Sequence, residues 1–132
     1  MRTVRVHREL IAGPATAWDL LVDPRRWPEW GPSVQSAEVD GGVLGPGAEG
    51  TVTTAVGVRL PFRVTSFEPG RRWAWAVAGL PATDHTVEAT SPGRCRVGFG
   101  VPWPAAPYLA VCRVALDRLD NLARRVATDH HD

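Results

Sequence analysis

The chain has 132 residues, a length typical of a single domain, and its content of 44% hydrophobic and 22% charged residues is that of a globular protein rather than a disordered one. The formal net charge of +1 gives no strong attraction for nucleic acid or an anionic membrane, and no apolar run approaches the roughly 18 residues needed to span a bilayer. Every basic residue is arginine, which excludes Schiff-base chemistry and the phosphate-binding loop that ends in a lysine.

The chain begins with a predicted strand that is followed by two short helices. Residues 3–10 alternate in polarity and include β-branched valines, which predicts a strand. Pro14 suits the first turn of a helix, and this helix ends before Pro24, because the residue that precedes a proline disfavours the α region. The apolar face of the helix consists of Ala17, Leu20 and Leu21. Pro24 opens a second short helix through Trp27, and we expect Pro28 to close it.

The middle of the chain predicts six more strands. They are Val34–Asp40, Gly50–Val56, Val58–Phe67, Arg71–Ala78, Asp84–Thr90 and Arg94–Val101. Glycine and proline residues separate them, with a predicted turn at Gly79–Pro81, and most of the connections have the length of a hairpin. We therefore expect one antiparallel meander.

The last segment changes from an alternating to a helical period. Its recurring apolar residues are Leu109, Cys112, Leu116, Leu119, Ala123 and Val126. They predict an amphipathic helix over Pro107–Thr128, with the pairs Arg113–Asp117 and Asp120–Arg124 on its polar face and a frayed tail at about residues 129–132. A helix of roughly 30 Å needs a large apolar partner, so we expect the seven strands to curl around it and to leave a cavity between sheet and helix.

Three segments of the sequence resemble a known family. They are IAGPATAWDLLVD at residues 11–23, WPEW at residues 27–30 and FEPGRRW at residues 67–73. Together they are similar to the START/Bet v 1-like (SRPBCC) superfamily and, within it, to bacterial polyketide cyclase/dehydrase-like proteins. The resemblance covers nearly the whole chain.

This resemblance implies the fold class and the kind of site. We expect one α+β domain over residues 1–132 with the helix-grip (Bet v 1-like) fold. In this fold a curved seven-stranded antiparallel sheet wraps around a long C-terminal helix, and two short helices follow the first strand. The resemblance also implies a deep apolar cavity without a built-in cofactor. The absence of lysine together with abundant alanine, valine and glycine indicates a GC-rich bacterial genome, and we expect the protein in the cytoplasm.

Three functions stay open, because this fold is shared by proteins with unrelated roles. The first is binding of a small hydrophobic molecule, aromatic and polyketide-like or lipid-like, in the cavity. The second is a polyketide cyclase/aromatase-type enzyme that catalyses aldol cyclisation and dehydration there, with a proton acceptor and a proton donor beside the substrate. The third is a protein-interaction module with a filled core. A cavity too small for about ten heavy atoms would exclude the first two.

The resemblance also implies a departure from the cyclases of the family. Those with established activity carry an inward arginine near the end of the strand that holds Phe62. The matching residue in this chain is Ser66. This weakens the cyclase alternative, although His85 together with Ser66 could substitute for the arginine.

His85 is the candidate for proton transfer if the protein is an enzyme. In the strand Asp84–Thr90 it shares one face with Val87 and Ala89, while the even positions are polar. An imidazole on the cavity face could hydrogen-bond a ligand or move a proton near neutral pH. The alternative is a histidine that bonds a neighbouring carbonyl group or water.

Aromatic side chains supply many of the candidate ligand contacts. Trp73 and Trp75 share one strand face, and a tryptophan can stack on a flat ligand or simply fill the core. Trp103 and Tyr108 flank a proline-rich connector before the long helix and could form the rim of a pocket. The candidate ligand-binding residues are Trp27, Leu60, Phe62, Val64, Ser66, Trp73, Trp75, His85, Val97, Phe99, Trp103, Tyr108 and Cys112.

Other kinds of site find little support in the sequence. Residues 45–50 match the dinucleotide pattern G-x-G-x-x-G, but a predicted strand follows where a helix N-terminus is needed. The histidines and cysteines form no metal-binding pattern, and we expect no metal or other cofactor. We expect no nucleic-acid partner and no membrane span, and the protein should be a monomer or a homodimer.

Overall fold

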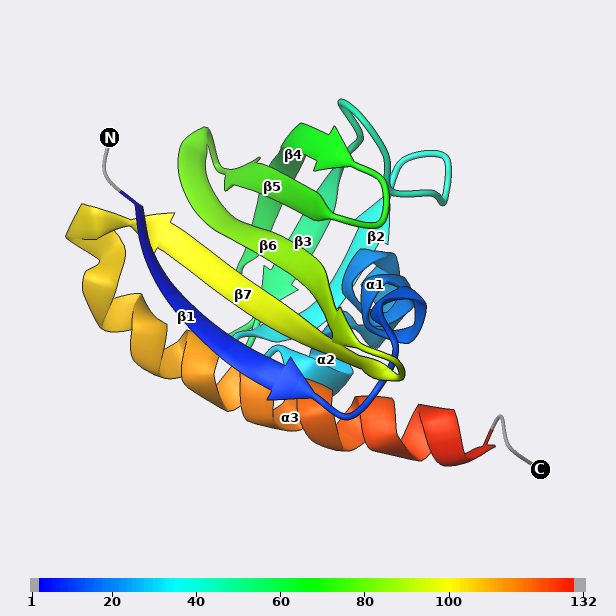
Figure 1. Ribbon diagram of the computed structural model, residues 1–132. Helices are drawn as coiled ribbons and strands as arrows, with labels where there is room; N and C mark the ends of the chain where they lie inside the picture. The colour runs from blue at the N-terminus through cyan, green and yellow to red at the C-terminus, as the bar shows by residue number, and fades with distance from the viewer. Residues whose placement is uncertain (1–2, 130–132) are drawn as a thin grey trace.

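The computed structural model describes residues 3–129, which form a curved sheet with a long helix across one side (Figure 1). The strands are β1 (Thr3–Leu10), β2 (Val34–Val39), β3 (Glu49–Thr54), β4 (Arg59–Glu68), β5 (Arg72–Val77), β6 (Leu80–Ser91) and β7 (Arg94–Pro102). The helical elements are α1 (Pro14–Val22), η1 (Pro24–Arg26), α2 (Trp27–Trp30), η2 (Trp103–Tyr108) and α3 (Leu109–Asp129). The sheet order is β1-β7-β6-β5-β4-β3-β2, with neighbouring strands antiparallel. The predicted helix-grip fold is confirmed.

Strand β6 begins at Leu80 instead of Asp84. The chain reverses at Ala78 and Gly79, where φ is 53° and 80°. Both residues occupy the left-handed region that suits a two-residue hairpin turn, so the chain is already extended at Leu80. Pro81, which was predicted to belong to the turn, lies opposite Ala76 of β5. The early start of β6 places its first residues beside the cavity described below.

Pro28 does not close the second helical segment, contrary to the prediction. It lies in the first turn of α2, which continues to Trp30. The first N–H groups of a helix have no partner within it, so a proline costs little there. The added turn buries Trp27 and Trp30, whose indole N–H groups donate to the carbonyl oxygens of Leu21 and Leu20 at 2.8 and 3.0 Å. These two bonds hold α2 against the end of α1.

The long helix α3 begins at Leu109 instead of Pro107. The connector that precedes it is the short 3-10 helix η2, which includes Pro107. A proline has a fixed φ and no N–H, which suits short helical turns better than the interior of an α-helix. The helix reaches Asp129, so the rest of the predicted frayed tail, residues 130–132, lies outside the described residues.

The apolar face of α3 is buried or half-buried as predicted, and the predicted pair of Asp120 and Arg124 forms, but Asp120 is buried and not on a solvated face. Asp120 is only 2% exposed, and its carboxylate accepts hydrogen bonds from Arg8 of β1 at 3.1 Å and from Arg124 at 3.2 Å. Arg8 also pairs with Asp117, which was predicted to pair with Arg113. A buried carboxylate is tolerated only when it is paired. The Asp120 cluster therefore fastens α3 to the edge strand β1.

Candidate functional site

A cavity of about 480 Å³, which we call the outer cavity, lies next to the end of η2 that leads into α3, although no α3 residue is among its described lining residues. It is open to solvent on one side and is lined by the ends of the β3–β4 and β5–β6 hairpins, the end of β7, the loop before β2, and η2. Its lining residues are Ser33, Val34, Val52, Thr54, Ala55, Val56, Leu60, Trp75, Val77, Pro81, Ala82, Thr83, Val101, Pro102, Ala105 and Tyr108. The volume is typical of a small-molecule site.

None of these described lining residues has a charged side chain. The polar side chains among them are the hydroxyls of Ser33, Thr54, Thr83 and Tyr108. The hydroxyl oxygens of Ser33 and Tyr108 lie 2.6 Å apart and share a hydrogen bond. Burial raises the pKa of the Tyr108 phenol, which is therefore uncharged at neutral pH. A molecule in the outer cavity meets apolar surface and a few hydroxyls.

A second cavity of about 50 Å³, the inner cavity, lies among buried residues. Its lining residues are Trp27, Trp30, Gly31, Pro32, Ser33, Val34, Trp73, Trp75, Thr83, His85, Phe99, Tyr108, Val111, Cys112 and Ala115. The residues common to both linings are Ser33, Val34, Trp75, Thr83 and Tyr108, so the two cavities adjoin. Since a water molecule occupies about 30 Å³ in the liquid, the inner cavity has room for only one or two heavy atoms.

Rings fill the space around the inner cavity. This aromatic cluster consists of Trp27, Trp30, Phe62, Trp73, Trp75, His85 and Phe99. Trp73 is stacked on both Trp27 and His85, with ring centroids 5.4 and 4.0 Å away and interplanar angles of 10° and 21°. Trp75 meets Trp73 edge-on at 5.6 Å. Within the cluster, Trp75 alone also lines the outer cavity.

His85 is enclosed by the aromatic cluster and held in one neutral tautomer. Its Nδ1 lies 3.2 Å from the carbonyl oxygen of Trp73, which can only accept, so Nδ1 carries the proton. Its Nε2 then accepts from the Thr83 hydroxyl at 3.0 Å, and that hydroxyl accepts from Trp75 Nε1 at 2.9 Å. Burial lowers the pKa of His85 to about 4. The imidazole is therefore uncharged at neutral pH, with both nitrogens in hydrogen bonds.

Ser66 lies on the face of the sheet opposite to the cavities, which corrects the predicted alternation of β4. A β-bulge between Val64 and Ser66 shifts the strand by one residue, so that Phe67 lies opposite Trp73. Phe67 therefore packs against the core. The Ser66 hydroxyl instead accepts a hydrogen bond from Arg72 Nη1 at 3.2 Å.

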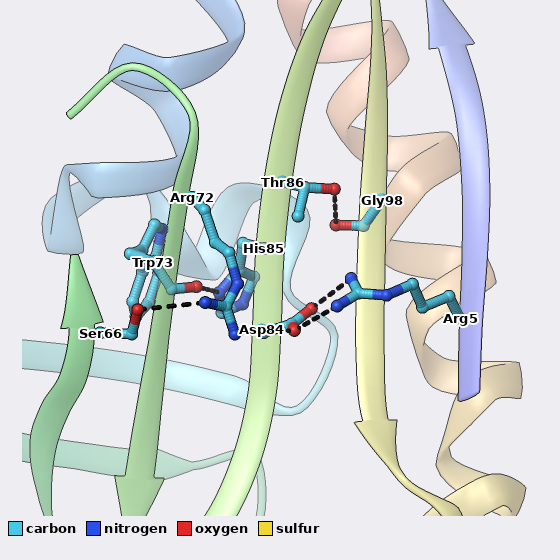
Figure 2. A network of polar contacts seen from close by, with 8 residues as sticks. All are labelled: Arg5, Ser66, Arg72, Trp73, Asp84, His85, Thr86 and Gly98. Carbon is cyan, nitrogen blue, oxygen red and sulfur yellow. Dashed lines mark hydrogen bonds and ion pairs between the residues drawn. The ribbon is translucent and has the colours of Figure 1, made fainter. Parts of the chain in front are cut away.

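The outer face of the sheet carries an ion-pair network (Figure 2). The two carboxylate oxygens of Asp84 accept hydrogen bonds from Arg5 at 2.6 Å each, and one of them also accepts from Arg72 at 3.4 Å. The Arg5–Asp84 pair bridges β1 and β6 across β7, where a Cβ on Gly100 would lie 2.7 Å from Asp84 Oδ1. Because Ser66 joins this outer network, it is not brought together with His85.

The predicted ligand-binding residues occupy four environments. Leu60, Trp75 and Tyr108 line the outer cavity. Trp27, Trp73, His85, Phe99 and Cys112 line the inner cavity. Phe62, Val64 and Val97 are buried in the core outside both linings. Ser66 lies on the outer face, and Trp103 is 59% exposed.

The parts of the lining that come from hairpin ends were not among the predicted ligand-binding residues. These are Thr54–Val56 at the end of β3 and Pro81–Thr83 at the start of β6. Thr83 matters most, because its hydroxyl joins Trp75 to His85. The available signal was the alternation of side chains along a strand. It places Thr83 on the same strand face as His85 once the strand is extended toward Leu80.

Within residues 3–129, no group of three or more histidine, cysteine, aspartate or glutamate side chains is placed to hold a metal ion. None of the helices in that range is long and apolar enough to cross a membrane. Cys95 and Cys112 are buried free thiols, and burial raises the pKa of each to about 11. Neither is therefore a thiolate at neutral pH.

Comparisons with known proteins agree with this architecture. The family described as polyketide cyclase / dehydrase and lipid transport matches residues 1–128. The structure of XoxI from Bacillus cereus has a TM-score of 0.73 at 16% identity, covering 96% of this chain and 99% of that one. A Mesorhizobium loti protein has a TM-score of 0.73 at 18% identity, with coverage of 94% and 98%. A Chromobacterium violaceum protein has a TM-score of 0.63 at 26% identity, with coverage of 92% and 96%. No curated protein matches the sequence.

Proposed function

The chain belongs to the polyketide cyclase/dehydrase and lipid transport family, and we propose that it binds an uncharged, mainly apolar molecule in the outer cavity. The observation that carries this proposal is a cavity of about 480 Å³ with no charged side chain among its described lining residues. This volume leaves room for well over ten heavy atoms. It therefore favours ligand binding over an interaction module with a filled core.

The uncharged lining favours an uncharged ligand over a charged one. A carboxylate or phosphate placed against the buried wall of this cavity, at Val52 or Val101, would lose hydration and meet no cation, at a cost of several kcal/mol, whereas at the exposed rim it would stay in water. A fatty acid would have to leave its carboxylate at the mouth, where Val56 is 85% exposed. An uncharged ring system or chain carries no such cost.

Trp75 supplies a flat wall for a ring. Its indole is fixed by the hydrogen bond from Nε1 to Thr83 Oγ1 at 2.9 Å, so little side-chain freedom remains to be lost on binding. Stacking of two rings contributes about 0.5–1.5 kcal/mol beyond the burial of area. A molecule with a planar ring should therefore bind more tightly than an aliphatic molecule of the same size.

Binding without chemistry is favoured over the cyclase alternative. Cyclisation by aldol chemistry needs a proton acceptor and a proton donor beside the substrate. His85 is the candidate, but both of its nitrogens are in hydrogen bonds and its pKa is about 4. Ser66, its possible partner, is engaged by Arg72 on the outer face of the sheet. This pair therefore does not meet the requirement.

Calorimetric titration with methylnaphthalene and naphthoate tests the proposal, because these probes have similar rings and differ in charge. We expect methylnaphthalene to bind and naphthoate to bind at least about tenfold more weakly, as the cost of burying an unpaired carboxylate requires. Equal affinities would overturn the preference for an uncharged ligand. No heat of binding with either probe would overturn the cavity proposal itself.

Two tryptophan variants locate the binding. Trp75→Leu keeps the wall apolar but removes the flat ring, so it should weaken methylnaphthalene several-fold and leave the affinity for an aliphatic probe such as butylcyclohexane almost unchanged. Trp103→Leu changes an exposed tryptophan outside both linings and serves as the matched control. An equal loss for both probes in Trp75→Leu would mean that Trp75 only fills space.

A further inference from the structure

The parts of the chain that form the outer cavity carry almost no charge. Its described lining residues all lie in runs of sequence without a charged residue, namely 30–37, 50–58, 60–62, 73–83 and 97–112. In the whole chain, 22% of the residues are charged. Charge is therefore depleted around the opening of this cavity and concentrated in the other parts of the chain.

Large apolar side chains are exposed in these uncharged runs. Val56 and Val58 lie in the turn between β3 and β4, Leu80 is the first residue of β6, and Trp103 is the first residue of η2. We call these four residues the apolar rim, because each lines the outer cavity or lies within two residues of one that does. Their exposed fractions lie between 50% and 85%. Single exposed apolar residues are ordinary, but several around one opening indicate an interaction surface.

The shape of the apolar rim favours a fluid partner over a folded one. Its residues stand on three separate segments, and between these segments lies the outer cavity of about 480 Å³. The core of a protein–protein interface is packed as closely as a protein interior. A folded partner, including a second copy of this chain, would leave the cavity unfilled beneath it. The head groups and acyl chains of a lipid bilayer adapt to such an irregular surface.

The charges next to the apolar rim fit the surface of a bilayer. Arg59 directly follows Val58 and is exposed, so its guanidinium is free to reach a lipid phosphate when Val58 contacts the membrane. The carboxylate nearest to the rim in sequence is that of Asp84, and it is paired with Arg5. Trp103 adds an amphipathic ring of the kind that favours the boundary between head groups and acyl chains.

We propose that the apolar rim docks on the surface of a lipid bilayer, with Val56, Leu80 and Trp103 inserted among the head groups and the outer cavity open toward the acyl chains. Burial of apolar side chains drives this contact, so it does not need the strong positive charge that the chain lacks. Four side chains bury little area, so the docking is reversible. The proposal goes beyond the proposed function, because it assigns an interaction surface that does not depend on which ligand the cavity holds.

Sedimentation with dioleoylphosphatidylcholine vesicles tests the docking. We expect wild-type protein to sediment with the vesicles, and Leu80→Asp to lower the partition coefficient about tenfold, because a carboxylate enters the interface poorly. Leu80 lies outside both cavity linings, so this variant should bind methylnaphthalene as the wild type does. Val43→Asp is the matched control, since Val43 is also exposed but precedes β3, whereas Val56 follows this strand. It should leave the partition coefficient unchanged.

Tryptophan fluorescence shows which residue enters the bilayer. Vesicles with brominated acyl chains should quench part of the emission of the wild-type protein, and Trp103→Phe should remove most of this quenching. Wild-type protein that stays in solution, or equal partition of Leu80→Asp and Val43→Asp, would overturn the docking. Intact binding of methylnaphthalene in that case would leave the proposed function standing. A dimer that Leu80→Asp dissociates, without vesicle binding by the wild type, would assign the apolar rim to a second copy instead.

Discussion

The two ends of the space between sheet and helix are built on the same strands but are packed differently. At the closed end, Trp73 of β5 is stacked on Trp27 and His85, and the inner cavity keeps only about 50 Å³. At the open end, Val77 of the same strand helps to line a cavity of about 480 Å³. The outer cavity thus lies where the strands change from large rings to small side chains, which reach less far from the sheet.

The comparison also separates stability from binding. Substitutions in the closed end remove packed rings and paired polar groups, so they should act on folding. Substitutions at the open end alter a surface that is already only partly packed, so they should change the affinity for the ligand and leave the stability of the fold almost unchanged. The predictions below test this division, beginning with the largest effect.

A charged side chain on the buried face of α3 should prevent folding. Leu116 is buried on α3, and Leu116→Asp would place a carboxylate against the sheet without a cation. The cost should approach or exceed the whole stability of a small domain, about 5–15 kcal/mol. Circular dichroism should show no cooperative melting transition for this variant. A folded Leu116→Asp protein would mean that the packing of α3 is misassigned.

A substitution to aspartate at the open end supplies the control. Ala105 lines the outer cavity but is exposed, so a carboxylate there stays hydrated. Ala105→Asp should change the free energy of unfolding by less than about 0.5 kcal/mol.

The closed end should make stability depend on pH. The pKa of His85 is lowered from 6.5 to about 4 in the folded protein, so between these values the unfolded chain binds a proton that the folded protein does not. The contribution of neutral His85 is therefore complete above pH 6.5 and is lost as the pH falls through about 4, amounting to about 3 kcal/mol. Urea unfolding of wild type and His85→Gln across this range measures it, because glutamine does not titrate. Parallel pH profiles for the two proteins would contradict the buried neutral state.

The change from valine to alanine, made at one residue in each end, compares how tightly the two ends are packed. Val64 is 2% exposed in the core, and Val77 lines the outer cavity. Val64→Ala should cost about 2 kcal/mol of unfolding free energy, from two lost methyl groups and the space they leave. Val77→Ala should cost less than about 1 kcal/mol, because part of its surface already faces the cavity. Chemical denaturation gives both values, and equal costs would contradict the division between the ends.

The architecture could be predicted because it follows from local periodicity. Strand β1 has its predicted bounds. The apolar face of α3 follows from apolar residues that recur at spacings of three and four along the sequence. The β-bulge near Ser66 could not be predicted in this way, since a polar residue suits the outer face as well as a cavity wall. Pro81 suggested a turn, whereas the positive φ of Ala78 lets the strand start earlier.

The site was harder to predict than the fold, because it depends on which side chains meet. The period of two places His85 on the inner face, but it does not indicate that Thr83 and Trp73 O occupy both ring nitrogens. The period of two also does not show which aromatic residues fill the core and which line a cavity. That division depends on where α2 is placed, because its Trp27 stacks on Trp73 of β5.

The central claim is that the outer cavity is the binding site, and methyl NMR tests it most directly. Methylnaphthalene is titrated into protein with labelled valine and leucine methyl groups. The account predicts shifts at Leu60, Val77 and Val101, which line the outer cavity, and little change at the core residues Val64 and Val97. Shifts confined to exposed residues such as Val43, or no shifts at the cavity residues at saturation, would contradict it.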